Sequence, residues 1–350
     1  MWHFSILAVL ALVSLNPSFH GRNSCEGYDL PGVSFALTPD HGAFDRTAAV
    51  HFSDGSSVAV AKIEGSSAYK AFMREQNVTI TQQTGSHHSL LHLAGSYLTE
   101  LNAKLWKHSE HLSRIETVPI KPMLQTLKAA VESYLGNYIC FVNLSLTKGE
   151  RQSDYQINAF NKAIHQVGLT NVWEHTFDPS IPAMISNRLD NHSEPEKLIL
   201  VVDNSRYGFN LGIFFRDDAL FQTIRHNYKL LDSQVRSPER SLILQHAIKS
   251  IIKPSFGSLP ITGHLPIHIG ELVLYGDDIW DPDFRQTLNL VLDAELISRV
   301  HDDQPVFSTA LGLAKLTFGQ INDPMSRANR KAQFGCCWRS EGKGCPISWS

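Results

Sequence analysis

The sequence predicts a mixed α/β fold. Between residues 138 and 318, apolar and β-branched runs of strand length alternate with longer runs whose apolar residues recur at helical spacing. This alternation is typical of α/β proteins. Two apolar runs, Leu198–Val202 and Leu211–Phe215, flank a short polar centre and predict two buried strands joined by a tight turn. With 350 residues, the chain can form one large domain or two.

The N-terminal residues predict secretion. An apolar run from Phe4 to Leu15 is followed by Pro17, Ser18 and small residues. The run is too short for an ordinary membrane span and fits a secretory signal peptide over residues 1–20. Because no later run is long enough to cross a bilayer, we expect a secreted, soluble protein without a membrane span.

Cysteines and glycosylation sequons fit a secreted protein. Four cysteines are candidates for two disulfides whose pairing stays open, and Cys140 is expected to remain a buried thiol because it lies in an apolar strand. Asn77 and Asn191 lie in polar surroundings and are expected glycan acceptors, whereas Asn143 lies in an apolar strand, where a glycan is disfavoured. The disulfide candidates are Cys25, Cys336, Cys337 and Cys345.

The first half of the chain predicts a hairpin and then alternating helices and strands. The runs Thr47–Phe52 and Ser57–Ile63 flank Asp54-Gly55, which is a strong hairpin signal. Leucine spacing predicts a long helix over residues 88–112 and a second helix over 118–135 that ends at Gly136. The next elements are a strand at 138–146, a helix at 148–167 ended by Gly168, a strand at 171–175 and a helix at 179–188.

The second half continues from the two central strands through Ala219–Leu230 to an amphipathic helix at Ser237–Ile252. Residues 253–268 are rich in Pro and Gly and predict a loop. The strand Glu271–Tyr275 then enters the turn Gly276-Asp277-Asp278, an arrangement that brings backbone amides to a ligand or simply connects a strand to a helix. Helices are predicted at 284–291 and at 306–318, the latter with Ala and Gly on a close-packing face.

Several segments resemble, in order, the nucleotide-binding domain of seventy-kilodalton-class heat-shock chaperones. The central hairpin Leu198–Phe215 is similar to their phosphate-2 hairpin, and Glu271–Asp278 is similar to their adenosine strand and turn. The match runs roughly over residues 120–320 and points to the actin-like ATPase superfamily, which also includes actin and sugar kinases. The other matching segments are Val131–Gly136 with Glu150-Arg151-Gln152, Gly168–Val172, Asp178-Pro179 with the helix to Asp190, and 303–314.

The resemblance implies a two-lobed actin-like ATPase (ribonuclease H-like) fold, in which each lobe is a mixed sheet with helices and the lobes close over a nucleotide. The implied units are a first lobe over residues 25–190, a second lobe over 191–321 and a Cys-rich tail over 322–350. The second lobe is shortened, because a long stretch of the chaperone domain is missing between the central hairpin and the adenosine strand.

The resemblance also implies where a nucleotide would bind. It places Asp203, Asn204, Ser205, Arg206 and Gly208 at the second phosphate turn, and Gly276 with Asp277 at the adenosine turn. Asp178 stands at a family acid before a helix, and Asp29 precedes Leu30–Ser34, the stretch nearest to the first phosphate loop. The competing local interpretations are turn formation by Asp203-Asn204-Ser205, helix capping by Asp178 and a solvated Arg206.

The same comparison predicts weak or absent nucleotide turnover. Ser205, Arg206 and Tyr207 replace glycines that let backbone amides approach phosphates, and Asp277 replaces a further glycine with a negative charge. We therefore expect a secreted binding or structural module without efficient ATP hydrolysis, whose partner is a protein or a small molecule. The alternative is an ATPase in which Arg206 meets phosphate and the acids Asp29, Asp178 and Asp203 hold Mg²⁺ through water.

Composition and motifs argue against nucleic-acid binding and against a metal site, and they leave one further class of function open. The net charge of -3 and the lack of a long basic block argue against nucleic acid as a partner. The 17 histidines are scattered and form no HExxH motif, so no metal site is predicted. A third interpretation, a secreted hydrolase or interaction module unrelated to nucleotides, stays open, although the chain has no G-x-S-x-G motif.

Overall fold

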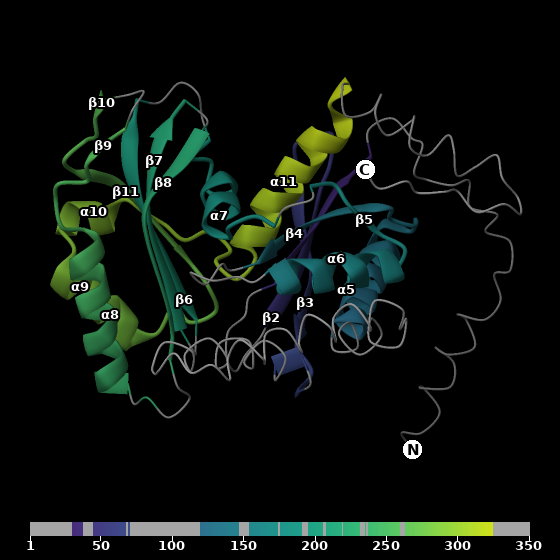
Figure 1. The fold of residues 1–350 in the computed structure, drawn as a ribbon, viewed down its shortest axis with the longest axis horizontal. Helices are drawn as coiled ribbons and strands as arrows, with labels where there is room; N and C mark the ends of the chain where they lie inside the picture. The colour runs from purple at the N-terminus through teal and green to yellow at the C-terminus, as the bar shows by residue number, and fades with distance from the viewer. Residues whose placement is uncertain are drawn as a thin grey trace, which may run out of the picture.

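The computed structural model describes residues 30–37, 45–67, 69–70, 120–146, 154–173, 176–190, 195–205, 208–218, 220–231, 235, 237–259 and 263–324. Within these residues the chain forms two mixed five-stranded sheets packed with helices (Figure 1). The predicted α/β class is therefore confirmed. The expected signal peptide, the helix at 88–112 and the tail from residue 325 lie outside the described residues.

The first sheet has the strand order β3-β2-β1-β4-β5. An antiparallel meander forms its first three strands, and the last two run parallel to β1. The predicted hairpin around Asp54-Gly55 is confirmed as the β2–β3 turn, where Gly55 has a φ of 85°. The strands are β1 (Gly32–Leu37), β2 (Asp45–His51), β3 (Ser57–Glu64), β4 (Phe141–Leu146) and β5 (Thr170–Asn171).

The second sheet repeats this arrangement. Its order is β12-β11-β6-β7-β8, with an antiparallel meander of β6, β7 and β8 and with β11 and β12 parallel to β6. Read from β8 to β12, order and directions match those of the first sheet. The strands are β6 (Lys197–Ser205), β7 (Gly208–Asp217), β8 (Leu220–Leu230), β11 (Ile269–Tyr275) and β12 (Val300–His301); β9 (Ser258–Leu259) and β10 (Gly263–His264) form a separate pair.

Each sheet has an outer layer of helices over a core of its own. The first sheet packs against α5 (Lys121–Leu135) and α6 (Asp154–Gln166), and the second against α8 (Ser237–Ile251) and α9 (Pro282–Val291) (Figure 1). The apolar stripes of these helices drive the packing, since Leu124, Leu127 and Val131 of α5 are fully buried. Gly136 ends α5 in a left-handed conformation with a φ of 66°, as predicted.

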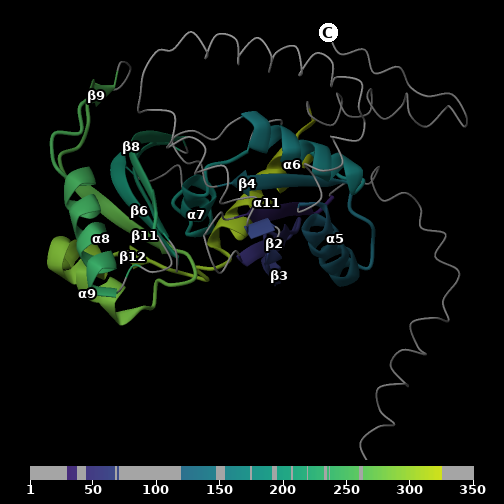
Figure 2. The ribbon, with the colours of Figure 1, turned by 60° about the horizontal axis from the view of Figure 1, so that its bottom comes forward.

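Two further helices, α7 (Ser180–Ser186) and α11 (Ser308–Asn322), lie between the sheets (Figures 1 and 2). Helix α7 packs on β6 and β11, whereas α11 packs on β1, β2 and β4 through small residues. The two helices touch at Gly312, where an added Cβ would stand 1.8 Å from the Pro182 carbonyl oxygen. The predicted close-packing face of the last helix is confirmed. The short helix α10 (Ala294–Ser298) follows α9.

The stretch nearest to the first phosphate loop runs into a strand. The stretch Leu30–Ser34, which the sequence comparison gave as the nearest to the first phosphate loop, leads into β1 (Gly32–Leu37). Val33, Phe35 and Leu37 alternate into the core of the first sheet, and the strand is held by pairing with β2 and β4. Residues 38–44, between β1 and β2, lie outside the described residues, as does Asp29.

No helix in the described part of the chain is long and apolar enough to cross a bilayer. Cys140, expected to be a buried thiol, is disulfide-bonded, and the residue with which it pairs lies outside the described ranges.

Asn143 is fully buried in β4, where its amide nitrogen donates to Thr317 and Gln320 of α11 at 3.1 and 2.8 Å. In the folded chain this sequon is therefore closed to a glycan. Asn77 and Asn191 are not among the described residues.

Candidate functional site at the ends of β6 and β11

The residues predicted for the second phosphate turn lie where β6 ends. Asp203, Asn204 and Ser205 are its last three residues, and all three are buried. Asp203 pairs with Asn210 of β7 on one side and with Tyr275 of β11 on the other, which places it inside the sheet. Ser205 pairs with Gly208, and Arg206 and Tyr207 between them lie outside the described residues.

The predicted adenosine turn meets the same point. Gly276 follows β11 with a φ of 111°, and its backbone nitrogen donates to the Pro305 carbonyl oxygen at 3.1 Å. An added Cβ would stand 2.3 Å from the Asn204 carbonyl oxygen, so both the backbone angle and the space require glycine. The fold thus brings together Asp203, Asn204 and Gly276, which the sequence comparison assigned to two separate turns.

Hydrogen bonds join the two strand ends into what we call the β6–β11 junction: Asn204, Ser205, Arg240, Gly276 and Asp278. The Asn204 side-chain amide donates to the Asp278 carbonyl oxygen at 2.7 Å, and the Asp278 backbone nitrogen donates to the Asn204 carbonyl oxygen at 3.1 Å. Through these reciprocal bonds, polar groups of the two strand ends satisfy each other. The neighbouring Asp277 is partly buried and also has an interaction partner.

Arg240, which the sequence did not single out, completes the junction. From the first turn of α8 it donates to the Asn204 side-chain oxygen at 2.8 Å and to the Ser205 carbonyl oxygen. Its Nη2 atom also lies 3.8 Å from the Asp278 carboxylate, and only 14% of its side chain is exposed. A guanidinium with this many acceptors fixes their geometry, because its planar donors have set directions.

A second polar group of residues lies beside the junction, between the second sheet and α7. The Tyr275 hydroxyl lies 3.3 Å from Ser180 Oγ and accepts from Asn210 Nδ2 at 3.4 Å. Burial raises the pKa of Tyr275 well above its ordinary value, and the charges of Asp203 and Asp178 raise it further. Tyr275 therefore stays neutral and can act as a hydrogen-bond group but not as a base near neutral pH.

Asp178 lies at the start of α7, where its Oδ1 accepts from the Ser180 backbone nitrogen at 2.9 Å. This bond fits the capping interpretation of Asp178. Its Oδ2 lies 4.0 Å from His226 Nε2 on β8. Buried Asn210 Oδ1 has no hydrogen-bond partner among the described residues, so the group offers one unused acceptor on β7, at the residue that pairs with Asp203.

Mg-ATP needs oxygen ligands for the metal ion and hydrogen-bond donors for the phosphates, and this region meets these two requirements to different degrees. Carboxylate and amide oxygens are donors that Mg²⁺ accepts, and Asp178, Asp203 and Asn210 provide them. However, no group of three or more His, Cys, Asp or Glu side chains placed to hold a metal ion occurs within the described ranges. A phosphate needs free backbone amides as hydrogen-bond donors, but the backbone nitrogens of Gly276 and Asp278 already donate to protein carbonyl oxygens. These two amides are therefore not free for a phosphate, whereas Arg206 and Tyr207, in the turn after β6, lie outside the described residues.

Comparisons with known proteins leave the site as the main source of functional evidence. A scan against models of protein families finds none that matches this chain, and a search of curated proteins finds no match either. Because one fold can carry many functions, the residues of the site are what indicate the function.

Proposed function

We propose that this protein is a secreted binding module on a divergent actin-like ATPase (ribonuclease H-like) fold with a shortened second lobe, and that it does not hydrolyse ATP efficiently. Two features support the fold proposal. The two sheets share one strand order, and α7 and α11 lie between them. Both features are what the resemblance to the heat-shock chaperone domain implies for a pair of lobes that face each other.

The hydrogen-bonded β6–β11 junction is the observation that carries the functional proposal. An ATPase of this kind needs a glycine-rich turn with free amides at the end of β6. Here Asn204 and Asp278 satisfy each other, and Arg240 is bound to Asn204 and Ser205. A phosphate entering this point would have to break these bonds and approach the carboxylate of Asp278, which lies at the junction.

Isothermal titration of the purified protein with Mg-ATP, together with an assay of phosphate release, tests the proposal. We expect no binding heat at sub-millimolar nucleotide and no release of phosphate above that of an Asp203→Asn variant. Sub-millimolar binding accompanied by turnover that Asp203→Asn abolishes would overturn the proposal. Since Asn is isosteric with Asp, the variant removes charge while retaining the packing of β6.

A nucleotide-binding ATPase with altered phosphate loops is the second candidate function. The unused Asn210 acceptor and the proximity of Asp178 and Asp203 to the Tyr275 hydroxyl favour it, because such oxygens can receive the water shell of Mg²⁺. In that case Asp178→Asn and Asp203→Asn would each abolish Mg²⁺-dependent turnover.

Both candidates include secretion, which is tested by recovering the tagged protein from culture medium with N-glycans at Asn77 and Asn191 but not at Asn143.

A further inference from the structure

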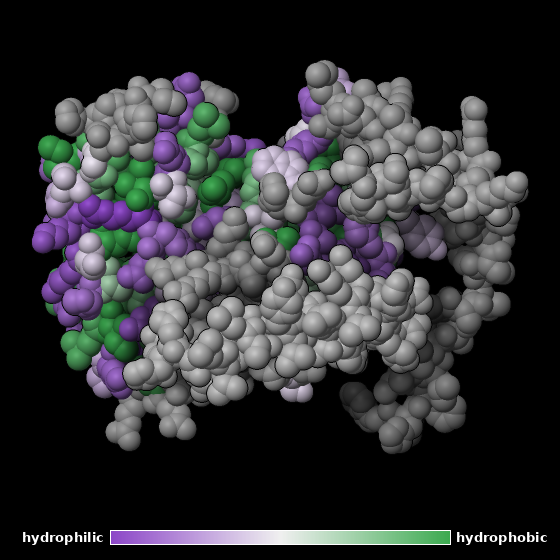
Figure 3. Space-filling view, viewed as in Figure 1, coloured by the Kyte–Doolittle hydropathy of each residue, from purple (hydrophilic) through white to green (hydrophobic). Residues whose placement is uncertain are grey.

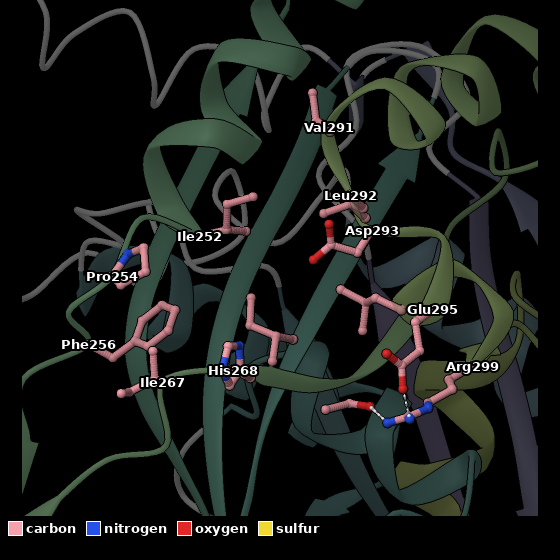
Figure 4. A pocket seen from close by; sticks show the side chains of 13 residues that line it. Ile252, Pro254, Phe256, Ile267, His268, Val291, Leu292, Asp293, Glu295 and Arg299 are labelled. Atoms are coloured by element: carbon pink, nitrogen blue, oxygen red, sulfur yellow. Dashed lines mark hydrogen bonds and ion pairs between the residues drawn. The ribbon is translucent and has the colours of Figure 1, made fainter.

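A pocket of about 470 Å³ lies at the other end of the second sheet from the β6–β11 junction (Figure 4). Ile269, at the start of β11, lines it, whereas the junction lies beyond Tyr275 at the end of the same strand. Six residue steps along a strand separate the two sites by about 20 Å. The pocket is therefore distinct from the predicted nucleotide site, and its volume is within the range of small-molecule sites, roughly 300–1,000 Å³.

The wall formed by the segment after α8 is held in place by Arg225 of β8. Its guanidinium donates to the carbonyl oxygens of Ile251, Lys253 and Ser255 and stacks over the Phe256 ring at 4.8 Å from the centroid. Three carbonyl contacts and a stacked ring fix the backbone that carries Phe256. The pocket wall is thus formed before any ligand arrives, which lowers the cost of binding.

Apolar side chains make up most of the lining. Ile252 and Phe256 face Leu292 across the pocket, and Ile267 stands at the rim with 69% of its surface exposed (Figure 4). Apolar residues also reach the surface around α8, α9 and α10, where green and purple atoms alternate (Figure 3). A ligand that fills the pocket would cover exposed apolar surface, which is favourable by about 25 cal/mol per Å².

The side chains with a full charge that line the pocket, Asp293, Glu295 and Arg299, carry a net negative charge. Arg299 is paired with Glu295 and donates to the Gly270 carbonyl oxygen at 3.5 Å, so its charge is neutralised within the lining. Asp293 stands at the N-cap position of α10, yet its side chain makes no capping bond and no ion pair with the described residues. In Figure 4 its carboxylate points across the pocket toward Ile252. Asp293, which is exposed, therefore brings a negative charge without an ion pair among the described residues to a pocket that apolar side chains and His268 also line.

We propose that this pocket binds a small amphipathic amine, with its apolar body between Phe256, Ile252 and Leu292 and its protonated nitrogen beside Asp293. Charge complementarity selects this class over fatty acids and other apolar anions, which would meet Asp293 as a like charge. The proposal concerns a site and a ligand class separate from nucleotide binding, and it stands whether or not the protein binds ATP.

Three naphthyl compounds of nearly equal shape test the charge preference. Titration of the full chain at low salt with 2-(1-naphthyl)ethylamine, 2-(1-naphthyl)ethanol and 1-naphthaleneacetate compares a cation, a neutral molecule and an anion. We expect the amine to bind most tightly and the carboxylate least tightly. Asp293→Asn should weaken the amine about three- to fivefold, the range of an exposed ion pair, while leaving the alcohol unchanged. Comparable binding of amine and carboxylate, or no binding of any compound at millimolar concentration, would overturn the proposal.

Two further variants separate a local effect from a general one. Glu239→Gln removes the same charge from the start of α8, thirteen residues or about 20 Å along the helix direction from Ile252, and should leave amine binding unchanged. Ile267→Ser removes apolar surface at an exposed position and should weaken amine and alcohol alike, by about threefold. If Glu239→Gln and Asp293→Asn reduced amine binding equally, the effect would arise from net charge and the proposed contact would be refuted.

Discussion

The carboxylate oxygen Oδ1 of Asp203 lies 2.6 Å from the position that a Cβ atom on Gly276 would occupy. The end of β6 and the turn after β11 are therefore in direct contact at a point where no other residue type fits. Because Asn204, Asp278 and Arg240 add hydrogen bonds around this contact, the two strand ends behave as one structural unit.

Gly276→Ala should lower the free energy of unfolding by about 3 kcal/mol or more, because it combines an unfavourable φ with overlap against the Asn204 backbone. Gly257→Ala is the matched control. Gly257 has a φ of 90°, and no atom of the described residues lies within 4 Å of the added Cβ, so this variant reports the backbone cost alone, about 1–2 kcal/mol. Urea unfolding measures both values, and equal losses would show that the contact with Asn204 does not matter.

Two glycines of α11 should respond to the same substitution with opposite signs. Gly312→Ala places a methyl group against the Pro182 carbonyl and should destabilise the protein by about 1–3 kcal/mol. Gly319→Ala meets no atom within 4 Å in the part of the chain that the structure describes and should stabilise it by about 0.5–1 kcal/mol through helix propensity. Thermal unfolding of the two variants checks this, and a stabilising Gly312→Ala would contradict the close approach of α7 and α11.

Arg240→Ala should cost about 2–3 kcal/mol, because it leaves the buried Asn204 side-chain oxygen and the Ser205 carbonyl without their donor. Arg240→Lys should recover only part of this loss, since an ammonium cannot reproduce the planar donor geometry. Arg299→Ala removes an exposed ion pair and should change stability by less than about 1 kcal/mol. Denaturant unfolding distinguishes them; similar losses for Arg240→Ala and Arg299→Ala would argue against the junction.

Stability should rise with pH across the titration range of His51. Burial lowers the pKa of His51 below its ordinary value of 6.5, and the nearby Lys315 lowers it further. Between the folded-state pKa and 6.5 the unfolded chain binds more protons, so the free energy of unfolding increases as pH rises toward 6.5 and is lost as pH falls. His51→Gln should reduce this slope. A slope unchanged by the substitution, or a His51 pKa above 6.5 by NMR, would contradict the prediction.

Local sequence signals predicted most elements of the fold. The Asp54-Gly55 turn and the helix end at Gly136 depend on residues that favour positive φ, so a few neighbouring residues suffice to place them. Strand β1 was missed because Pro31-Gly32 is typical of a loop, whereas the strand is fixed by pairing with β4, whose residues lie more than a hundred positions along the chain. Such pairing leaves no signal in a short window.

The candidate site was predicted only in part for a similar reason. Asp203, Asn204 and Gly276 were found because they stand in apolar strands that end in polar turns. Arg240 lies 36 residues from Asn204, within a helix where an arginine usually faces solvent, and Asp278 lies 74 residues from Asn204. Which strand end these side chains meet depends on how α8 and β11 pack, and that information exists only in three dimensions.

Helices α7 and α11 are exchanged between the two halves of the molecule. Helix α7 follows the strands of the first sheet in the chain but covers the second, and α11 follows the second sheet but covers the first. A chain cut near residue 190 would therefore leave the inner face of the first sheet, including Ala36 and Ala49, without its cover. The five strands of the first sheet are therefore made early, but the face that packs on α11 is covered only after that helix has been synthesised.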